Sequence, residues 1–162
     1  MYVISYKKQL ERISEMIPLR KNEQTFEVFY HDPSSGKLWK SFFPHYPYFK
    51  NGPKLLRPEP LPSSIEHQLE LCLNSGDKTD AVGLGIEYSL QPEKWEEIFE
   101  ILERNRKSFI RSSFIAFLNS LGARTPDETL KEVKESLNLT SEELNEYKKR
   151  SKKLYLKRLM GI

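Results

Sequence analysis

The sequence has one cysteine and no long apolar run, and each shortage excludes a class of protein. Cys72 alone cannot form an internal disulfide or a site with several cysteine ligands, so we expect a reducing, cytoplasmic location. Apolar runs such as FIAFL at 114–118 fall far below the ~20 residues that span a bilayer. The N-terminus MYVISYKKQLER mixes charge into its apolar positions. We therefore expect no membrane anchor and no secretory signal.

Catalytic and metal-binding patterns are also lacking. The three histidines, His31, His45 and His67, lie far apart, and no HExxH-type spacing occurs. The single cysteine falls on the inward face of its expected helix, which disfavours a cysteine nucleophile. Gly83 and Gly85 lack the strand and the third glycine of a nucleotide-binding loop, so we expect them to permit close helix packing. We predict no catalytic residue, no metal and no cofactor.

Charge is present in both signs but is divided unevenly along the chain. The formal net charge is +3. Residues 1–103 contain 12 Lys/Arg and 16 Asp/Glu, whereas residues 104–162 contain 14 and 7. Such a division fits either a basic surface that meets an anion or long helices with a solvated charged face. Both interpretations stay open on the sequence alone.

The first 62 residues predict one helix, one β-hairpin and an extended connection. Apolar residues recur at helical spacing over 2–17, and Pro18 then ends the pattern. The aromatic runs QTFEVFY and KLWKSFF flank HDPSSG, whose residues favour a turn, so 1–43 predicts a helix followed by a β-hairpin. Six of the ten prolines lie within 44–62, which predicts a stiff, extended connection without a regular element.

The segment 63–162 predicts about six helices, arranged as three consecutive helical hairpins. Signals for the start of a helix occur at Ser64, Pro92, Thr125 and Thr140, and a signal for the end of a helix occurs at Gly122. A capping box is expected at Thr140 with Glu143. The helical spacing predicts a core centred on Trp95, Ile98, Leu102, Phe114, Phe117 and Leu118. The three hairpins lack strong self-similarity, so a short solenoid-like stack remains an alternative.

An aromatic, proline-rich surface is the first candidate site. Nine aromatic residues lie between Phe26 and Phe49, and only one face of a hairpin can pack on helices. Exposed rings beside rigid prolines lose few torsions on binding, which favours contact with another protein. The alternative is that the connection folds back and buries the rings. The candidate partner-binding residues are Trp39, Tyr46, Tyr48, Phe49 and Arg57.

The basic C-terminal helix is the second candidate site. Residues 147–158 contain seven Lys/Arg and no acid, and the inward face is assigned to Leu144, Tyr147, Ser151 and Leu154. We therefore expect the basic residues to point mostly outward, and the candidate patch is Lys149, Lys152, Lys153 and Lys157. Nucleic acid, an anionic lipid or an acidic protein would suit it. Cations that complement the helix dipole are the structural alternative.

The stretch TLKEVKESLNLTSEELNEYKKRSKKLYLKRL resembles the helix-turn-helix of bacterial sigma-factor region 4 over about the last 35 residues. That resemblance implies a DNA-reading second helix. The sequence departs from the pattern at Lys134, where the motif keeps a small residue, and at Asn138, where it has the turn glycine. Glu142 and Glu143 occupy the first turn of the second helix, where they would repel a DNA backbone.

Together these features predict a single α+β domain over 1–162, predominantly helical, with the N-terminal helix and β-hairpin packed on the helical array. We expect a non-enzymatic, cytoplasmic protein that binds another protein through the aromatic surface, as an immunity protein or an adaptor would. Nucleic-acid binding through the basic helix is the alternative, and a small enzyme of unknown class is the third hypothesis.

Overall fold

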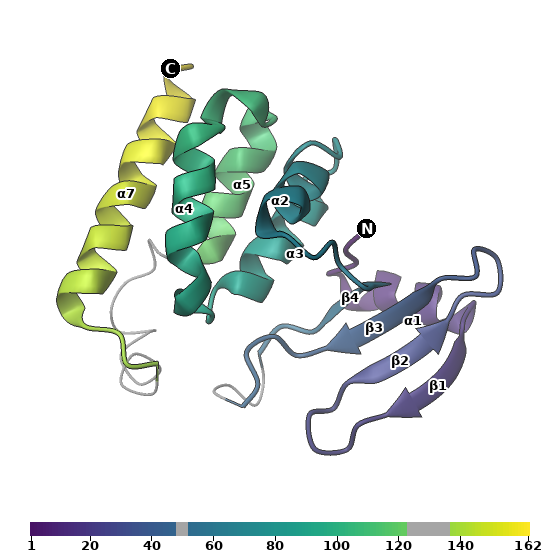
Figure 1. Cartoon of the computed structure of the whole chain (residues 1–162). Coiled ribbons are helices and arrows are strands. Elements are labelled where there is room, and N and C mark those ends of the chain that lie inside the picture. Colours follow the sequence, from purple (N-terminus) through teal and green to yellow (C-terminus); the bar gives the residue numbers. More distant parts are fainter. Residues whose placement is uncertain (48–51, 123–136) are drawn as a thin grey trace. The chain divides into compact units, whose positions relative to one another are not determined.

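The computed structural model describes residues 1–47, 52–122 and 137–162, and the chain divides into two compact units. Unit 1 is Met1–Ser63 and contains one helix and a β-sheet, whereas unit 2 is Ser64–Ile162 and is helical (Figure 1). The structure is therefore α+β. Whether 1–162 forms a single domain stays a prediction.

Unit 1 is built on a four-stranded antiparallel sheet in the order β1-β2-β3-β4. Helix α1 begins after the N-cap Ser5, whose side chain accepts a hydrogen bond from the Lys8 backbone N–H. Neighbouring strands in sequence are neighbours in the sheet, and Tyr30 in β2 lies opposite Trp39 in β3. The elements are α1 (Tyr6–Ser14), β1 (Ile17–Lys21), β2 (Val28–His31), β3 (Leu38–Phe42) and β4 (Leu55–Glu59).

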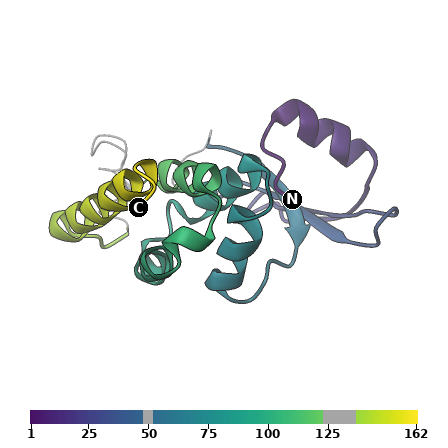
Figure 2. The same ribbon diagram turned by 90° about the horizontal axis from the view of Figure 1, so that it is seen from above.

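One face of the sheet packs against α1, as Figure 2 shows, and this contact forms the core of unit 1. Side chains alternate between the two faces of a strand, so Tyr30 and Trp39 point toward α1 while Phe29 and Lys40 lie on the other face. Met16, Tyr30, Trp39 and Leu56 are the buried residues of this core, with Val3, Ile13 and Val28 packed at its margin.

The predicted arrangement of the N-terminal segment is wrong in three respects. The helix ends at Ser14, because the N–H groups of Glu15 and Met16 bond the Arg12 and Ile13 carbonyls in a tightened last turn. Residues 17–21 then form β1, where Pro18 is tolerated because β1 is an edge strand. The expected hairpin is β2–β3, but β1 and β4 extend it to four strands. Strand β4 lies inside the connection expected to be irregular.

Unit 2 begins with α2, which is capped by Ser64, and continues with α3, which is capped by Asp77. Helix α5 ends at Gly122, whose φ of 78° is left-handed. Helix α7 begins with the expected capping box of Thr140 and Glu143. The elements are α2 (Ile65–Leu73), α3 (Lys78–Tyr88), η1 (Pro92–Lys94), α4 (Trp95–Arg104), η2 (Arg106–Ser108), α5 (Arg111–Leu121) and α7 (Ser141–Leu159).

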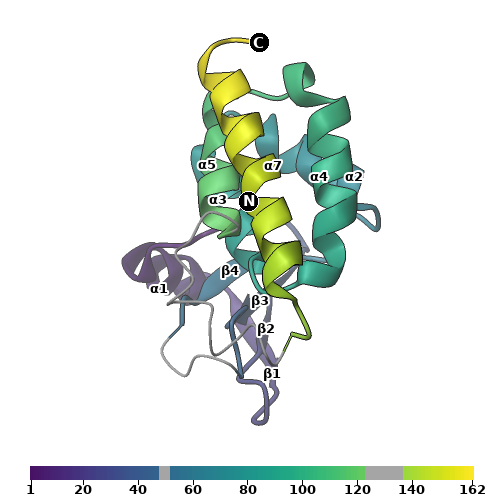
Figure 3. The same cartoon turned by 90° about the vertical axis from the view of Figure 1, so that its left-hand side faces the viewer.

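The prediction of three consecutive helical hairpins is also wrong. Helix α5 packs along α3, and α7 packs against both α4 and α5 (Figure 3), so α4 and α5 do not form a paired unit. Gly85 permits the α3–α5 contact, since a Cβ there would lie 2.7 Å from Ser120 Cβ and 2.9 Å from the Phe117 carbonyl oxygen. The helix expected to begin at Thr125, and with it the third predicted pair, falls on 123–136 and lies outside the described residues.

The predicted core of unit 2 is confirmed. Trp95, Ile98, Leu102, Phe114, Phe117 and Leu118 are each at most 1% exposed. Helix α7 closes this core with Leu144, Ser151 and Leu154, which are buried as the spacing predicts. Within the described segments, no helix combines the length and hydropathy that crossing a membrane requires.

Candidate functional site

The outer face of α7 carries the four lysines predicted as a basic patch, and we call Lys149, Lys152, Lys153 and Lys157 the lysine patch. The first three are exposed and Lys157 is half-buried. Among the described residues, none of the four makes an ion pair. The lysine patch therefore presents positive charge to solvent, and no carboxylate of the described residues pairs with it.

The inner side of α7 is fixed to α4 by a different basic residue. Arg150 donates hydrogen bonds to Glu96 and to Glu103, with a closest N···O distance of 2.9 Å to each. The hydrogen bonds that Arg150 donates to Glu103, and then to Glu96, hold its pKa above the ordinary value. Since Arg150 takes up these two α4 carboxylates, they do not pair with the lysine patch.

Tyr147 completes the contact between α7 and α4. Its ring lies 5.5 Å from the Trp95 ring in an edge arrangement and 5.5 Å from the Phe99 ring in a stacked one. Its hydroxyl donates a 3.1 Å hydrogen bond to Glu96. Burial, reinforced by the Glu96 carboxylate, raises the pKa of Tyr147. This packing sets the rotation of α7 about its axis and thereby keeps the lysine patch outward.

The structure separates the residues of the predicted aromatic surface. Trp39 is buried beneath α1, and the Arg12 guanidinium lies 4.7 Å from its ring centre. Arg57 is also buried, with Nη1 2.5 Å from Glu59 Oε1 and its guanidinium over the Phe42 ring. Tyr46 is exposed, whereas Tyr48 and Phe49 lie outside the described residues.

Tyr46 does have an aromatic neighbour on the surface of unit 1. Its ring meets the ring of Phe26 edge to face at 5.6 Å, and both side chains are exposed. Phe26 has a φ of 61°, a left-handed conformation that is uncommon for a bulky residue. Among the described residues, the predicted aromatic surface is thus reduced to this pair of exposed rings in contact.

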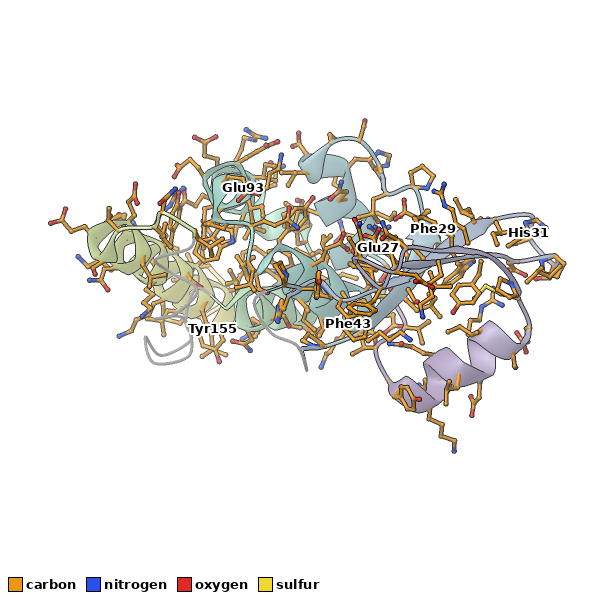
Figure 4. The ribbon with its side chains drawn as sticks, turned by 90° about the horizontal axis from the view of Figure 1, so that it is seen from below. Glu27, Phe29, His31, Phe43, Glu93 and Tyr155 are labelled. Carbon is orange, nitrogen blue, oxygen red and sulfur yellow. The ribbon has the colours of Figure 1, made fainter. Side chains whose placement is uncertain are left out.

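The face of the sheet opposite α1 carries charged and aromatic side chains in alternation. Glu27, Phe29 and His31 project from β2 and the residue before it (Figure 4). The Arg20 guanidinium lies 4.3 Å from the Phe29 ring centre. A shallow pocket of about 520 Å³ beside this pair is lined by Arg20, Lys21, Asn22, Glu23, Glu27 and Phe29. Its lining mixes both signs of charge and selects no class of ligand.

Two groups of residues that matter in the structure were missed by sequence reasoning. Asp32 organises the β2–β3 turn, and the pattern Asp-Pro-Ser-Ser-Gly could have indicated an Asx turn. Arg106, Arg111 and Arg158 gather at the C-terminal end of α7. Arg158 was counted among the seven basic residues of 147–158 but was given no place of its own, and it is buried. Only the packing of α7 on α5 reveals that burial.

The resemblance to sigma-factor region 4 stays a prediction. Lys134 and the helix expected to contain it fall outside the described residues. Asn138 has a φ of 53°, the left-handed conformation that a glycine adopts easily in a tight turn. Across the described parts of the chain, no group of three or more His, Cys, Asp or Glu could hold a metal ion.

No protein-family model, curated protein or solved structure matches the chain with statistical significance.

Proposed function

We propose that this chain is a non-enzymatic binding protein whose lysine patch contacts the phosphate backbone of a nucleic acid. The supporting observation is that four lysines on one helix are solvent-accessible and make no ion pair among the described residues. Lysine residues that neutralise phosphates release condensed counterions, which supplies most of the affinity in non-specific nucleic-acid binding.

The spacing of the patch favours a linear polyanion. Lys149, Lys153 and Lys157 follow one another at intervals of four residues, so their Cα atoms advance by about 6 Å per step along the helix. Such a row offers successive contacts to a strand that carries a phosphate at every nucleotide. Because Glu142 and Glu143 precede the row at the start of α7, we propose contact through the later turns only. Cys72 is buried and forms no disulfide among the described residues, in keeping with a cytoplasmic location.

The test measures binding of a fluorescein-labelled single-stranded RNA by anisotropy over a series of salt concentrations. If all four lysines contact phosphates, log affinity should fall with log salt at a slope of about −3, at about −0.7 per contact. Replacing Lys149, Lys152, Lys153 and Lys157 by Gln should weaken binding by about tenfold or more and flatten the slope. A matched control replaces Lys7, Lys8, Lys21 and Lys37, which are exposed lysines of unit 1.

The control removes the same four charges, so it should retain most of the affinity and the slope. Equal losses in the two variants would mean that net charge, and not the α7 patch, drives binding. Unchanged affinity in the α7 variant would refute the proposal outright. Circular dichroism at 222 nm should show that both variants remain helical, since Gln is nearly as good a helix former as Lys.

A second proposal is that the chain binds another protein through Tyr46 and Phe26. The exposed edge-to-face pair of rings favours it, because clustered aromatic residues supply much of the energy of protein interfaces. Affinity purification from the native host, with nucleic acid retained, distinguishes the two proposals. A protein lost from Tyr46→Ser but kept by the lysine variant supports protein binding, whereas RNA lost from the lysine variant alone supports the first proposal.

A further inference from the structure

The C-terminal end of α7 lies beside the connection from α4 to α5 (Figure 1, Figure 3). Hydrogen bonds place three arginines at this point. Arg106 belongs to η2, Arg111 is the first residue of α5, and Arg158 lies in the last turn of α7. We call these residues the arginine corner. All three belong to unit 2, and each is fixed by a hydrogen bond to a main-chain oxygen.

Arg158 is the most constrained member of the corner. Its side chain is nine-tenths buried, with the guanidinium 5.7 Å from the Phe114 ring centre. Nη2 donates a 2.6 Å hydrogen bond to the Phe109 carbonyl oxygen, while Nε is buried without a partner. Buried charges in proteins are normally paired, and an isolated one is costly. No carboxylate among the described residues pairs with Arg158.

The two other arginines add positive charge to the same place. Arg106 Nε donates a 2.9 Å hydrogen bond to the Ile162 main-chain oxygen, and Arg111 Nη2 donates one to that of Leu159. Neither is paired with an Asp or Glu side chain among the described residues. Burial lowers the pKa of Arg158, and the nearby charges of Arg111 and Arg106 lower it further. The corner thus concentrates like charges that repel one another.

The beginning of α5 contributes to this positive potential. Ile110 is the N-cap of this 11-residue helix, and its apolar side chain cannot cap the first-turn N–H groups. The positive end of the helix dipole therefore lies at Arg111, beside the guanidinium that contacts Phe109.

Capping of the α7 carbonyls explains part of this arrangement but not all of it. An arginine has five N–H donors, and each of these three uses one on a main-chain oxygen. Capping needs cations near the last carbonyls, yet it gives no reason for a buried guanidinium that lies near two further arginines and has no Asp or Glu partner among the described residues. A bound anion would offset the repulsion among the three arginines and would accept hydrogen bonds from their remaining N–H groups.

We propose that the arginine corner binds a phosphomonoester group. Guanidinium groups match phosphate oxygens in planar, two-point geometry, and a phosphomonoester carries a charge of about −1.5 to −2 at pH 7. A phosphodiester carries a single negative charge, so it neutralises three cations less well. A free phosphate and the terminal phosphate of a nucleic acid share this chemistry. The second source rests on the proposed function of the lysine patch and is the one we favour.

The first experiment uses inorganic phosphate and the full chain. Isothermal titration at constant ionic strength should detect phosphate binding in excess of chloride. Arg111→Gln and Arg106→Gln should each weaken it by about tenfold or more, because each removes charged hydrogen bonds. Arg158→Leu should also weaken phosphate binding. If that variant fails to fold, the Arg111 and Arg106 variants still test the site. Arg104→Gln is the matched control, since Arg104 is exposed and pairs with Glu66.

A second experiment distinguishes free phosphate from the terminal phosphate of a nucleic acid. A 5′-phosphorylated RNA should bind more tightly than the same RNA with a 5′-hydroxyl, and Arg111→Gln should abolish that difference while the lysine variant retains it. Phosphate binding without a 5′-phosphate preference would overturn the terminal-phosphate assignment. Absence of any phosphate preference over chloride, or equal losses in Arg104→Gln, would overturn the site. If the proposal for the lysine patch is wrong, a separate result shows it: the lysine variant binds 5′-hydroxyl RNA with unchanged affinity.

Discussion

Arg12 and Asp32 form an ion pair between α1 and the β2–β3 turn, with Arg12 Nη2 2.5 Å from Asp32 Oδ2. The same guanidinium covers the Trp39 ring, so one side chain joins the turn, the helix and the core of unit 1. Asp32 also accepts hydrogen bonds from the Ser34 backbone N–H at 3.0 Å, the Ser34 hydroxyl at 2.7 Å and the Ser35 hydroxyl at 2.7 Å.

Stability should depend on the ionisation of Asp32. Hydrogen bonds from Ser34 and Ser35, together with Arg12, hold the pKa of its carboxyl well below its ordinary value. A lowered folded-state pKa stabilises the fold fully above the unfolded-state pKa of about 3.9, and this contribution is lost as the pH falls below it. Urea unfolding should show the deficit of Asp32→Asn to be largest at pH 7 and smaller at pH 3. A deficit that is independent of pH would contradict the assignment.

Phe114 should be among the most sensitive positions of unit 2. It is fully buried in α5, so Phe114→Ala removes apolar contact area and leaves a cavity that the packed helices fill only in part. The expected loss is about 3 to 5 kcal/mol in the free energy of unfolding. Leu71→Ala on the exposed side of α2 is the control and should change stability by less than about 0.5 kcal/mol. Equal effects in denaturant titrations would refute the packing.

Gly85 should not tolerate even a methyl group. Alanine is the better helix former by about 1 kcal/mol, so Gly85→Ala would stabilise an isolated α3. In the fold, the new Cβ would meet Ser120 Cβ at 2.7 Å and the Phe117 carbonyl at 2.9 Å. Forcing α3 and α5 apart should cost about 1 to 3 kcal/mol, which outweighs the propensity gain. Thermal unfolding measures the balance, and a raised midpoint would contradict the close approach.

The Arg150 ion pairs should contribute modestly and in a salt-dependent manner. Arg150→Met keeps most of the apolar stem but removes the bonds to Glu96 and Glu103, whose carboxylates remain partly hydrated. We expect a loss of about 1 kcal/mol at low salt and less at 1 M NaCl. Arg104→Met, which breaks one exposed pair with Glu66, should cost less than Arg150→Met. The reverse order in urea unfolding would show that α7 is held differently.

Sequence patterns predicted those features that depend on neighbours along the chain. The capping box at Thr140 and the left-handed stop at Gly122 are local, and the helical spacing around Phe114 places it inward on any partner. Strand β4 was missed because Pro58 and Pro60 obscure a strand whose pairing with β3 is long-range. The packing of α5 on α3 instead of α4 likewise depends on Gly85, whose importance appears only when the facing helix is known.

The candidate sites also include features that follow from one helix and features that depend on distant packing. The outward direction of Lys149, Lys152 and Lys153 follows from the period of one helix, so the sequence was sufficient. Trp39 was a candidate for the partner-binding surface, with burial as the alternative, and α1 covers it. No local pattern encodes that a helix lies over β3. Arg158 illustrates the same limit, since its burial depends on the start of α5 about fifty residues earlier, where Phe109 accepts its hydrogen bond.

Pro18 has a consequence for how molecules of this protein behave toward one another. Strand β1 forms one edge of the sheet and exposes Ile17 and Leu19, a combination that invites a second copy to add its own strand. Pro18 and the irregular register between Pro18 and Arg20 interrupt the regular ladder that such an addition requires. The proline that the sequence pattern assigned to the end of a helix therefore lies in an edge strand, where it disfavours edge-to-edge pairing of folded chains.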